Sequence, residues 1–352
     1  MNNLGDIKIA IAGIGNCCSA LVQGIEYYQN NSTNMGLLHP NIGKYSINDI
    51  EIVAGFDIDK NKIEKDLSVA IFSEPNKAPK YIEVKNSGVD IMMGPAPDNV
   101  QEDSMTELIK ADTKPVDVTK VLVEKEADIF VNLISGGSDK ASRVYAEACL
   151  DAGCGLINAT PSGIVNNLAL ASDFKKKGLP LAGDDLMSQM GATALHMGLL
   201  EFMEDRGVQV DESFQLDVGG GSESINTLEK TREIKRRIKT EVVKSVVPYN
   251  FDLISGSADF VDFLVNGRDS FFYFKGKYFT GAEFTMDVKL STQDAPNAGS
   301  ILVDTIRGLK IAKDCGLGGP IEAICAYGFK RPPKYLTLKE AYRQFHNFIG
   351  EK

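Results

Sequence analysis

A run of basic residues in the second half of the chain is the strongest candidate for chemistry on an anion. Lys235, Arg236 and Arg237 are consecutive, and Lys239 follows two positions later. Four cations this close together could hold a small anion even on an acidic protein. The alternative is an ordinary solvated helix face, which charge runs of this kind often form. The sequence therefore predicts an anion site here and leaves the solvated face open.

Paired carboxylates form a second candidate. Asp184 and Asp185 follow a short apolar segment, and a buried carboxylate pair is costly unless it has a function. A structural role is the alternative. The three histidines and six cysteines show neither a Cys-x-x-Cys pair nor a zinc-like spacing. We therefore predict no metal site and expect reduced thiols, as in a cytosol.

A glycine turn near the N-terminus is the candidate cofactor site. The β-branched run 7–12 ends in Gly13-Ile14-Gly15, and apolar residues at helical spacing follow. Gly13 would permit the turn and Gly15 would admit a pyrophosphate at the helix N-terminus, while Cys18 stands where the usual third glycine would be. Asp57 ends the next predicted strand, where a carboxylate favours NAD over NADP. A purely structural glycine turn is the alternative.

Two patterns along the chain, one before and one after about residue 205, predict the helices and strands that position these residues. Predicted strands at 7–12, 51–56, 128–134, 155–158 and 179–182 alternate with predicted helices at 116–126, 139–152 and 168–177, which is typical of a doubly wound parallel α/β sheet. After about residue 205, strands predicted at 213–218, 270–274, 277–279 and 283–290 indicate a central α+β domain with a mostly antiparallel sheet. A helix predicted at 297–313 is expected to return to the first domain.

Size and charge limit the class of protein. A chain of 352 residues commonly forms two packed units. A net charge of −10 argues against nucleic acid as a partner. No stretch approaches the roughly 20 apolar residues that span a bilayer, and no signal segment precedes the first strand. We expect a cytoplasmic enzyme that does not bind membranes.

Several ordered segments resemble the bacterial myo-inositol-1-phosphate synthase family. The resemblance begins with the glycine turn and its helix and extends over nearly the whole chain. The matching segments are 13–28, 56–59, 66–68, 183–185, 188–193, 204–209, 294–297 and 316–320.

The resemblance implies a Rossmann domain at 1–200 and 297–352, and a catalytic and oligomerisation domain at 201–296, assembled as a homotetramer. It implies an isomerase of inositol and phospholipid biosynthesis that uses bound NAD to convert glucose 6-phosphate to myo-inositol 1-phosphate without net redox. Hydride leaves C5, C6 is enolised and closes on C1, and the same hydride returns.

Site residues carried over from the family fall into three groups. Lys239, Arg268, Asp184 and Asp294 are implied to be catalytic, and Lys235, Arg236, Arg237 and Lys239 to hold the substrate phosphate. The residues implied to bind NAD are Gly13, Gly15, Asn16, Cys17, Cys18, Asp57, Asp66, Ser135, Tyr145, Asp185, Ser188 and Glu223.

Two departures from the family pattern affect proton transfer. Met187 stands where the family has a lysine, and methionine can neither donate a proton nor carry charge. Arg268 replaces a second lysine and keeps the charge, but arginine is effectively never deprotonated. Two alternatives therefore stay open: an enzyme that acts on a different sugar phosphate, or a catalytically silent protein that binds NAD or a sugar phosphate.

Overall fold

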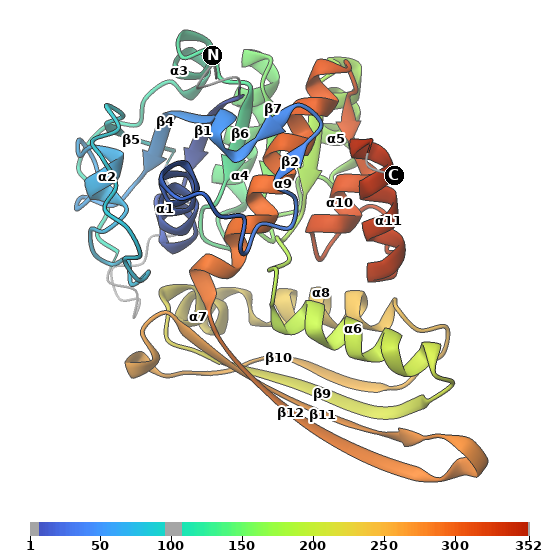
Figure 1. Cartoon of the computed structure of the whole chain (residues 1–352). Coiled ribbons are helices and arrows are strands. Elements are labelled where there is room, and N and C mark those ends of the chain that lie inside the picture. The colour runs from blue at the N-terminus through green and yellow to red at the C-terminus, as the bar shows by residue number, and fades with distance from the viewer. Residues whose placement is uncertain (1–6, 96–107, 351–352) are drawn as a thin grey trace.

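The computed structural model describes residues 7–95 and 108–350, which form two large sheets and one small two-stranded sheet (Figure 1). The larger sheet has seven parallel strands in the order β13-β8-β7-β6-β1-β4-β5. Its strands are short and almost wholly buried, as expected when helices cover both faces. They are β1 (Ile7–Ala12), β4 (Ile50–Asp57), β5 (Ile91–Met93), β6 (Ile129–Asn132), β7 (Gly155–Asn158), β8 (Pro180–Gly183) and β13 (Gly319–Pro320).

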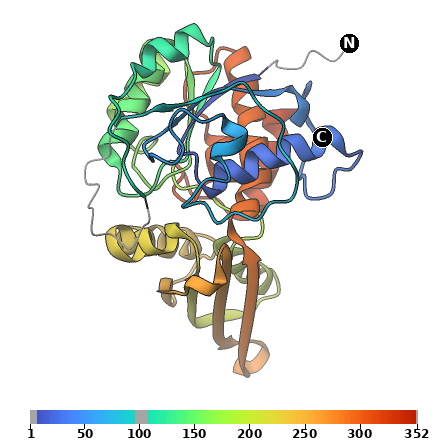
Figure 2. The ribbon, with the colours of Figure 1, turned by 90° about the vertical axis from the view of Figure 1, so that its left-hand side faces the viewer.

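Helices cover the two faces of the large sheet (Figure 2). On one side α1 (Asn16–Asn30) packs against α9 (Asp294–Asp314), and α10 (Glu322–Gly328) and α11 (Leu338–Ile349) follow. On the other side α3 (Val118–Glu124), α4 (Asp139–Ala152) and α5 (Leu168–Lys176) pack in sequence. The segment before β4 forms the small hairpin of β2 (Asn41–Ile42) and β3 (Tyr45–Ser46), and α2 (Leu67–Ala70) follows β4.

The smaller sheet has four strands in the order β10-β9-β11-β12. They are β9 (Gln209–Gly219), β10 (Asp252–Phe260), β11 (Gly267–Lys277) and β12 (Glu283–Gln293). Helices α6 (Ala192–Asp205) and α8 (Arg232–Lys244) lie between this sheet and the upper unit, as Figure 1 shows. The short helix α7 (Ser222–Asn226) and a π-helical turn at Thr227–Thr231 lead into α8.

The predicted fold class is confirmed, with corrections in the smaller sheet. β7 and α4 have the predicted bounds, whereas β10 was not predicted at all. The strand predicted at 277–279 does not exist separately, because Lys277 ends β11 and Phe279 begins a 3₁₀ turn. β10 pairs parallel with β9, since α7 and α8 carry the chain back between them, so the sheet is mixed. No helix in the described part of the chain is long and apolar enough to cross a membrane.

Candidate active site

The glycine turn lies where the strand order of the large sheet reverses. β1 has β4 on one side and β6 on the other, and this point is where α/β proteins of this kind bind ligands. Gly13 has a φ of +87°, and an added Cβ would meet the Leu133 carbonyl carbon at 2.7 Å. A side chain at Gly13 is therefore excluded by both conformation and contact.

Asp57, at the end of β4, is fixed beside this turn. Its Oδ2 accepts the Ile14 N–H at 2.7 Å, and its Oδ1 accepts the Ile58 N–H at 2.7 Å. Lys62 Nζ lies 3.7 Å from Oδ2. The carboxylate is thus held at the strand end, where the ribose of a dinucleotide would lie.

The start of α1 is open to a ligand. A Cβ built on Gly15 would meet no atom within 4 Å, and Gly15 caps α1 without any side-chain hydrogen bond. No acidic residue occupies the first turn of the helix. The exposed N–H groups and the helix dipole therefore suit a phosphate. The residues present fit the pyrophosphate of NAD.

Two ion pairs link the smaller sheet to the helices beside it; the first is buried, whereas the side chains of the second are about one-fifth exposed. Lys239 Nζ, on α8, donates to Asp217 Oδ2 on β9 at 2.5 Å. Arg268, on β11, makes a two-pronged contact with Asp294 at the start of α9, with Nε to Oδ1 at 2.9 Å and Nη2 to Oδ2 at 2.6 Å. Burial raises the pKa of Asp217, but Lys239 and Arg268 outweigh it and hold that pKa below its usual value. Asp217 therefore stays a carboxylate.

Lys235 and Lys330 add two more cations. Lys235 Nζ donates to Thr227 Oγ1 at 2.9 Å, and Lys330 Nζ lies 3.0 Å from Asp185 Oδ1. Burial lowers the pKa of Lys235 to about 8; Asp185 opposes this fall, whereas Lys330, Lys239 and Arg268 add to it. These mutual effects put the four cations in one site. An ammonium group with this pKa can give up and regain a proton near neutral pH.

A carboxyl pair completes the cluster. Burial, and then repulsion by Asp294, raises the pKa of Glu223 to about 7, although Arg268 opposes the rise. Burial also acts to raise the pKa of Asp294, but Arg268 and a hydrogen bond with Glu223 bring it to about 2. Glu223 is therefore protonated below neutral pH while Asp294 is a carboxylate.

The glycine turn and the cation cluster belong to one site. Burial raises the pKa of Cys17, in the first turn of α1, to about 12, and the charges of Asp294, Glu223, Lys235 and Arg268 all act on the same thiol. Asn226 Nδ2 also donates to the carbonyl of Gly136, in the loop after β6, at 2.8 Å. The segment that leads into α8 therefore reaches the cofactor edge of the large sheet.

Three unpaired polar atoms mark the same region. Among the described residues, Ser224 Oγ, Thr231 Oγ1 and Asn266 Nδ2 are buried without a hydrogen-bond partner. An unpaired buried polar group is costly, so its presence calls for an explanation. A ligand bound beside these atoms would supply the missing partners.

Asp184 has a different environment from its neighbour Asp185. Its carboxylate is fully buried and accepts hydrogen bonds from Asn158, the N–H groups of Ile164 and Val165, and Asn166. Burial raises the pKa of Asp184, although these hydrogen bonds oppose the rise. With its acceptor sites used by the 160–167 loop, Asp184 is placed to position Asp185 rather than to touch a substrate.

Helix geometry separates the four predicted phosphate ligands. Lys235 and Lys239 are one helical turn apart and face the cluster, as residues at i and i+4 do. Arg236 lies along β10, where its Cγ is 3.8 Å from the position of a Cβ on Gly256. Arg237 lines a different pocket. The structure thus brings two of the four residues to the site.

The remaining residues predicted to bind the cofactor differ in their surroundings: some hold a loop or helix in place, some lie in the core, and some are partly or fully exposed. The Asn16 side chain accepts the N–H groups of Lys77 and Ala78 and so ties a loop to α1. Asp66 caps α2, and although burial acts to raise its pKa, hydrogen bonds from Ser68 and Ser87 lower it to about 2. Cys18 and Tyr145 are buried in the core, whereas Ser135 is exposed and Ser188 is half-buried.

Two site residues were absent from the predicted set, and one substitution is explained by packing. Asp217 gave no signal in the sequence, because only the strand pairing brings β9 under α8. Lys330 was not among the predicted site residues, because it comes from the segment after α10, far from the others in the sequence. Met187 is 5% exposed and packs in the apolar cluster of α6, α8 and the smaller sheet. The described residues contain no group of three or more side chains placed to hold a metal ion.

Together these features define a class: an α/β protein with a glycine turn open to a phosphate where the strand order of its sheet reverses, and a partly buried cluster of cations beside that turn. The sequence model of the family described as myo-inositol-1-phosphate synthase matches residues 191–295. The inositol-3-phosphate synthase of Mycolicibacterium smegmatis is 38% identical over 98% of both chains. The chain therefore belongs to the inositol-3-phosphate synthase family.

Solved structures share the fold of this chain. The crystal structure of Ari2 has a TM-score of 0.79 at 29% identity and covers 98% of this chain, which covers 99% of Ari2. A myo-inositol-1-phosphate synthase-related protein from Thermotoga maritima also has a TM-score of 0.79, with the same coverage at 21% identity, and so supports the fold alone.

Proposed function

We propose that this protein converts glucose 6-phosphate to myo-inositol 1-phosphate with tightly bound NAD and no net redox. The observation that supports the proposal is that the segment leading into α8 donates a hydrogen bond to the loop after β6, and that the charge of Lys235 acts on Cys17 beside the Gly13 turn. A dinucleotide held at the turn would then lie beside cations suited to a sugar phosphate. When bound, NAD would accept a hydride from C5 of the sugar and return it after ring closure.

Each charged residue has a proposed part in the reaction. Lys239 and Arg268, fixed by Asp217 and Asp294, hold the negative charge of the phosphate and of the developing oxyanions. Arg268 is effectively never deprotonated, so it supplies charge and does not move a proton. Lys235, with a pKa of about 8, carries the proton that the closing aldehyde oxygen takes up.

Lys330 compensates in this proposal for the lysine that Met187 replaces. Its Nζ is 3.0 Å from Asp185, two residues before Met187. The side chain therefore brings an ammonium group to the end of β8 from the segment after α10. This placement favours an active enzyme over the catalytically silent alternative.

Product formation tests the proposal. The purified protein with NAD and glucose 6-phosphate is expected to form inositol phosphate without accumulating NADH. Steady NADH accumulation without a cyclic product would support oxidation without ring closure. No turnover, together with measurable NAD binding, would support the silent alternative.

Gly15 offers a test of cofactor binding that leaves the fold intact. Gly15→Ala is expected to fold normally, because its φ is −90° and a Cβ there meets nothing within 4 Å. The new methyl group would occupy space that the pyrophosphate needs, so NAD affinity should fall by about tenfold or more. Calorimetric titration with NAD measures the effect. Gly24→Ala, further along the same helix and also in open space, is the matched control and should bind NAD normally.

We further propose that residues 1–200 and 297–352 form the NAD-binding unit, and that residues 201–296 serve catalysis and assembly as a homotetramer. The face of the small sheet away from α6 and α8 supports assembly. On it lie Phe214, Leu216, Ile254, Phe271 and Tyr273, of which Ile254 is 55% exposed and Phe271 40%. A second copy of this face would cover these side chains.

The Ile254 side chain allows the assembly to be tested. Ile254→Glu places a charge in the centre of the apolar face, and we expect the oligomer to dissociate into smaller species by light scattering. Leu168→Glu, which removes an 86% exposed leucine from the start of α5, is the control and should leave the oligomer unchanged. An intact oligomer in the Ile254→Glu variant would place the contact elsewhere.

A further inference from the structure

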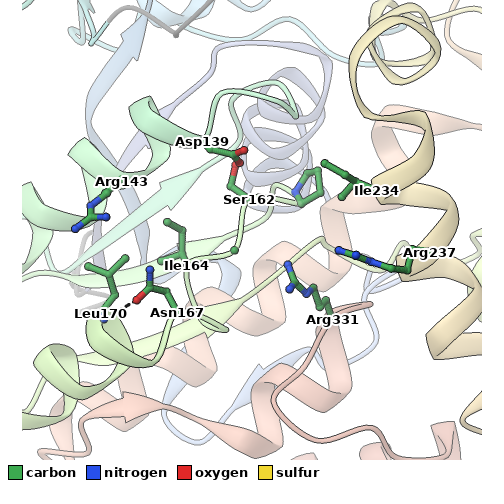
Figure 3. A pocket seen from close by; sticks show the side chains of 11 residues that line it. Asp139, Arg143, Ser162, Ile164, Asn167, Leu170, Ile234, Arg237 and Arg331 are labelled. Atoms are coloured by element: carbon green, nitrogen blue, oxygen red, sulfur yellow. Dashed lines mark hydrogen bonds between the residues drawn. The ribbon is translucent and has the colours of Figure 1, made fainter.

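A pocket lies against the face of α8 that carries Ile234 and Arg237 (Figure 3). It has a volume of about 300 Å³, at the lower end for small-molecule sites. Its walls come from the start of α4, the 160–167 loop, α5, α8 and the segment after α10. None of the residues that line it belongs to the cluster described above.

Two arginine side chains converge in this pocket. Figure 3 shows the guanidinium groups of Arg237 and Arg331 directed toward each other across it. Among the described residues, no carboxylate lies within ion-pair distance of Arg331, and the nearest carboxylate oxygen to Arg237, on Glu241, is 3.9 Å from Nε. A third arginine, Arg143, is paired with Glu147 at 2.9 Å. Two guanidinium groups therefore face each other with little compensating charge.

Two guanidinium groups directed into the same pocket repel each other, and an anion between them would relieve this repulsion. One carboxylate, that of Asp139, also lines the pocket, so the arginines still outnumber the acids. A dianion would relieve the repulsion and could accept hydrogen bonds from both planar guanidinium groups. A phosphate group has the charge and the number of acceptor oxygens for this geometry.

We propose that this pocket is a second phosphate-binding site, separate from the active site, for a small phosphorylated molecule. The rest of its lining fits a compact apolar body next to the phosphate. Pro161, Ile164, Leu170 and Ile234 supply apolar surface around the arginines. The ligand class is therefore a phosphate monoester with a small organic part, and free phosphate is the other source of the same group.

The pocket shares its two basic segments with the active site. On α8, Ile234 and Arg237 face the pocket, whereas Lys235 and Lys239 face the cation cluster. Lys330 and Arg331 are consecutive: Lys330 faces the cation cluster, and Arg331 faces the pocket. The backbone of Arg331 also exchanges two hydrogen bonds with that of Asp184, at 3.1 and 3.3 Å. An occupant of the pocket thus contacts the segments that carry Lys235 and Lys330 and can change their placement.

Calorimetric titrations with inorganic phosphate and with glycerol 3-phosphate test the proposal. For the wild-type protein we expect two sites per chain for at least one probe. The R237Q/R331Q double variant should lose one site, with an affinity reduced by about tenfold or more. The Lys239→Met/Asp217→Asn double variant should lose phosphate binding at the cation cluster and keep it at the pocket that holds Arg237 and Arg331. The probe that binds this site more tightly identifies the source of the phosphate.

Two variants guard against trivial explanations. Arg237→Gln alone removes a side chain that is 64% exposed, so the fold cannot depend on it, and it should still weaken the second site. Arg343→Gln, which removes a surface arginine paired with Glu340 on α11, should leave both sites unchanged. A single site per chain, or a second site that survives in R237Q/R331Q, would overturn the proposal.

Discussion

Replacing Lys239 with methionine is expected to abolish useful activity and to destabilise the protein at the same time. Loss of a charge that meets a developing oxyanion lowers kcat by about 10²–10³-fold. The same change leaves the Asp217 carboxylate, 2% exposed, buried without its partner, which costs about 3–5 kcal/mol. Steady-state kinetics and urea unfolding measure the two effects.

A companion substitution separates the two effects. Adding Asp217→Asn to Lys239→Met removes the unpaired buried charge, so the free energy of unfolding should recover most of its loss while activity stays low. Arg236→Gln, on the same helix but directed along β10, is the matched control and should retain near-normal activity. If the double variant recovered activity together with stability, Lys239 would be a structural residue only.

Lys235→Arg is expected to separate charge from proton transfer. Arginine keeps the positive charge, so KM for glucose 6-phosphate should change little, but it cannot release a proton. Loss of a general acid or base lowers kcat by about 10²–10⁴-fold. The wild-type kcat/KM should fall as pH rises through about 8, because Lys235 loses its proton there.

The pH profile distinguishes this role from a purely electrostatic one. In the Lys235→Arg variant the fall near pH 8 should vanish, since arginine stays charged throughout the range. A variant that kept both its kcat and the alkaline limb would contradict the assignment of proton transfer to Lys235. Glu223→Gln serves as a control for the second titrating group, whose pKa is about 7. This variant should retain the limb near pH 8.

Local patterns were enough to predict the large sheet and the glycine turn. The parallel strands are continuous apolar runs, and the turn after β1 needs glycine at a φ of +87°, so each signal lies within a few residues. The smaller sheet was harder to predict because its pairings are distant in sequence. Parallel pairing of β9 with β10 depends on α7 and α8 crossing back between them, and β10, which has a single fully buried residue, lacks an apolar run.

Distance along the sequence also explains which site residues were not predicted. The residue types of the basic run predicted an anion site, but only the helix shows which residues face it: Lys235 and Lys239 point to one pocket and Arg237 to another. Lys330 comes from a segment almost a hundred positions away, and its approach to Asp185 depends on the packing of α10 against β8. Spacing along a sequence carries no information about such a contact.

The fate of a labelled hydrogen tests the central claim most directly. The claim is that a nicotinamide at the Gly13 turn and the α8 cations act on one sugar in one site. Glucose 6-phosphate carrying deuterium at C5 should give inositol phosphate that retains the deuterium, with none released to free NADH, because the hydride leaves and returns within the same complex. Product without deuterium, or deuterium accumulating in free NADH without ring closure, would contradict it.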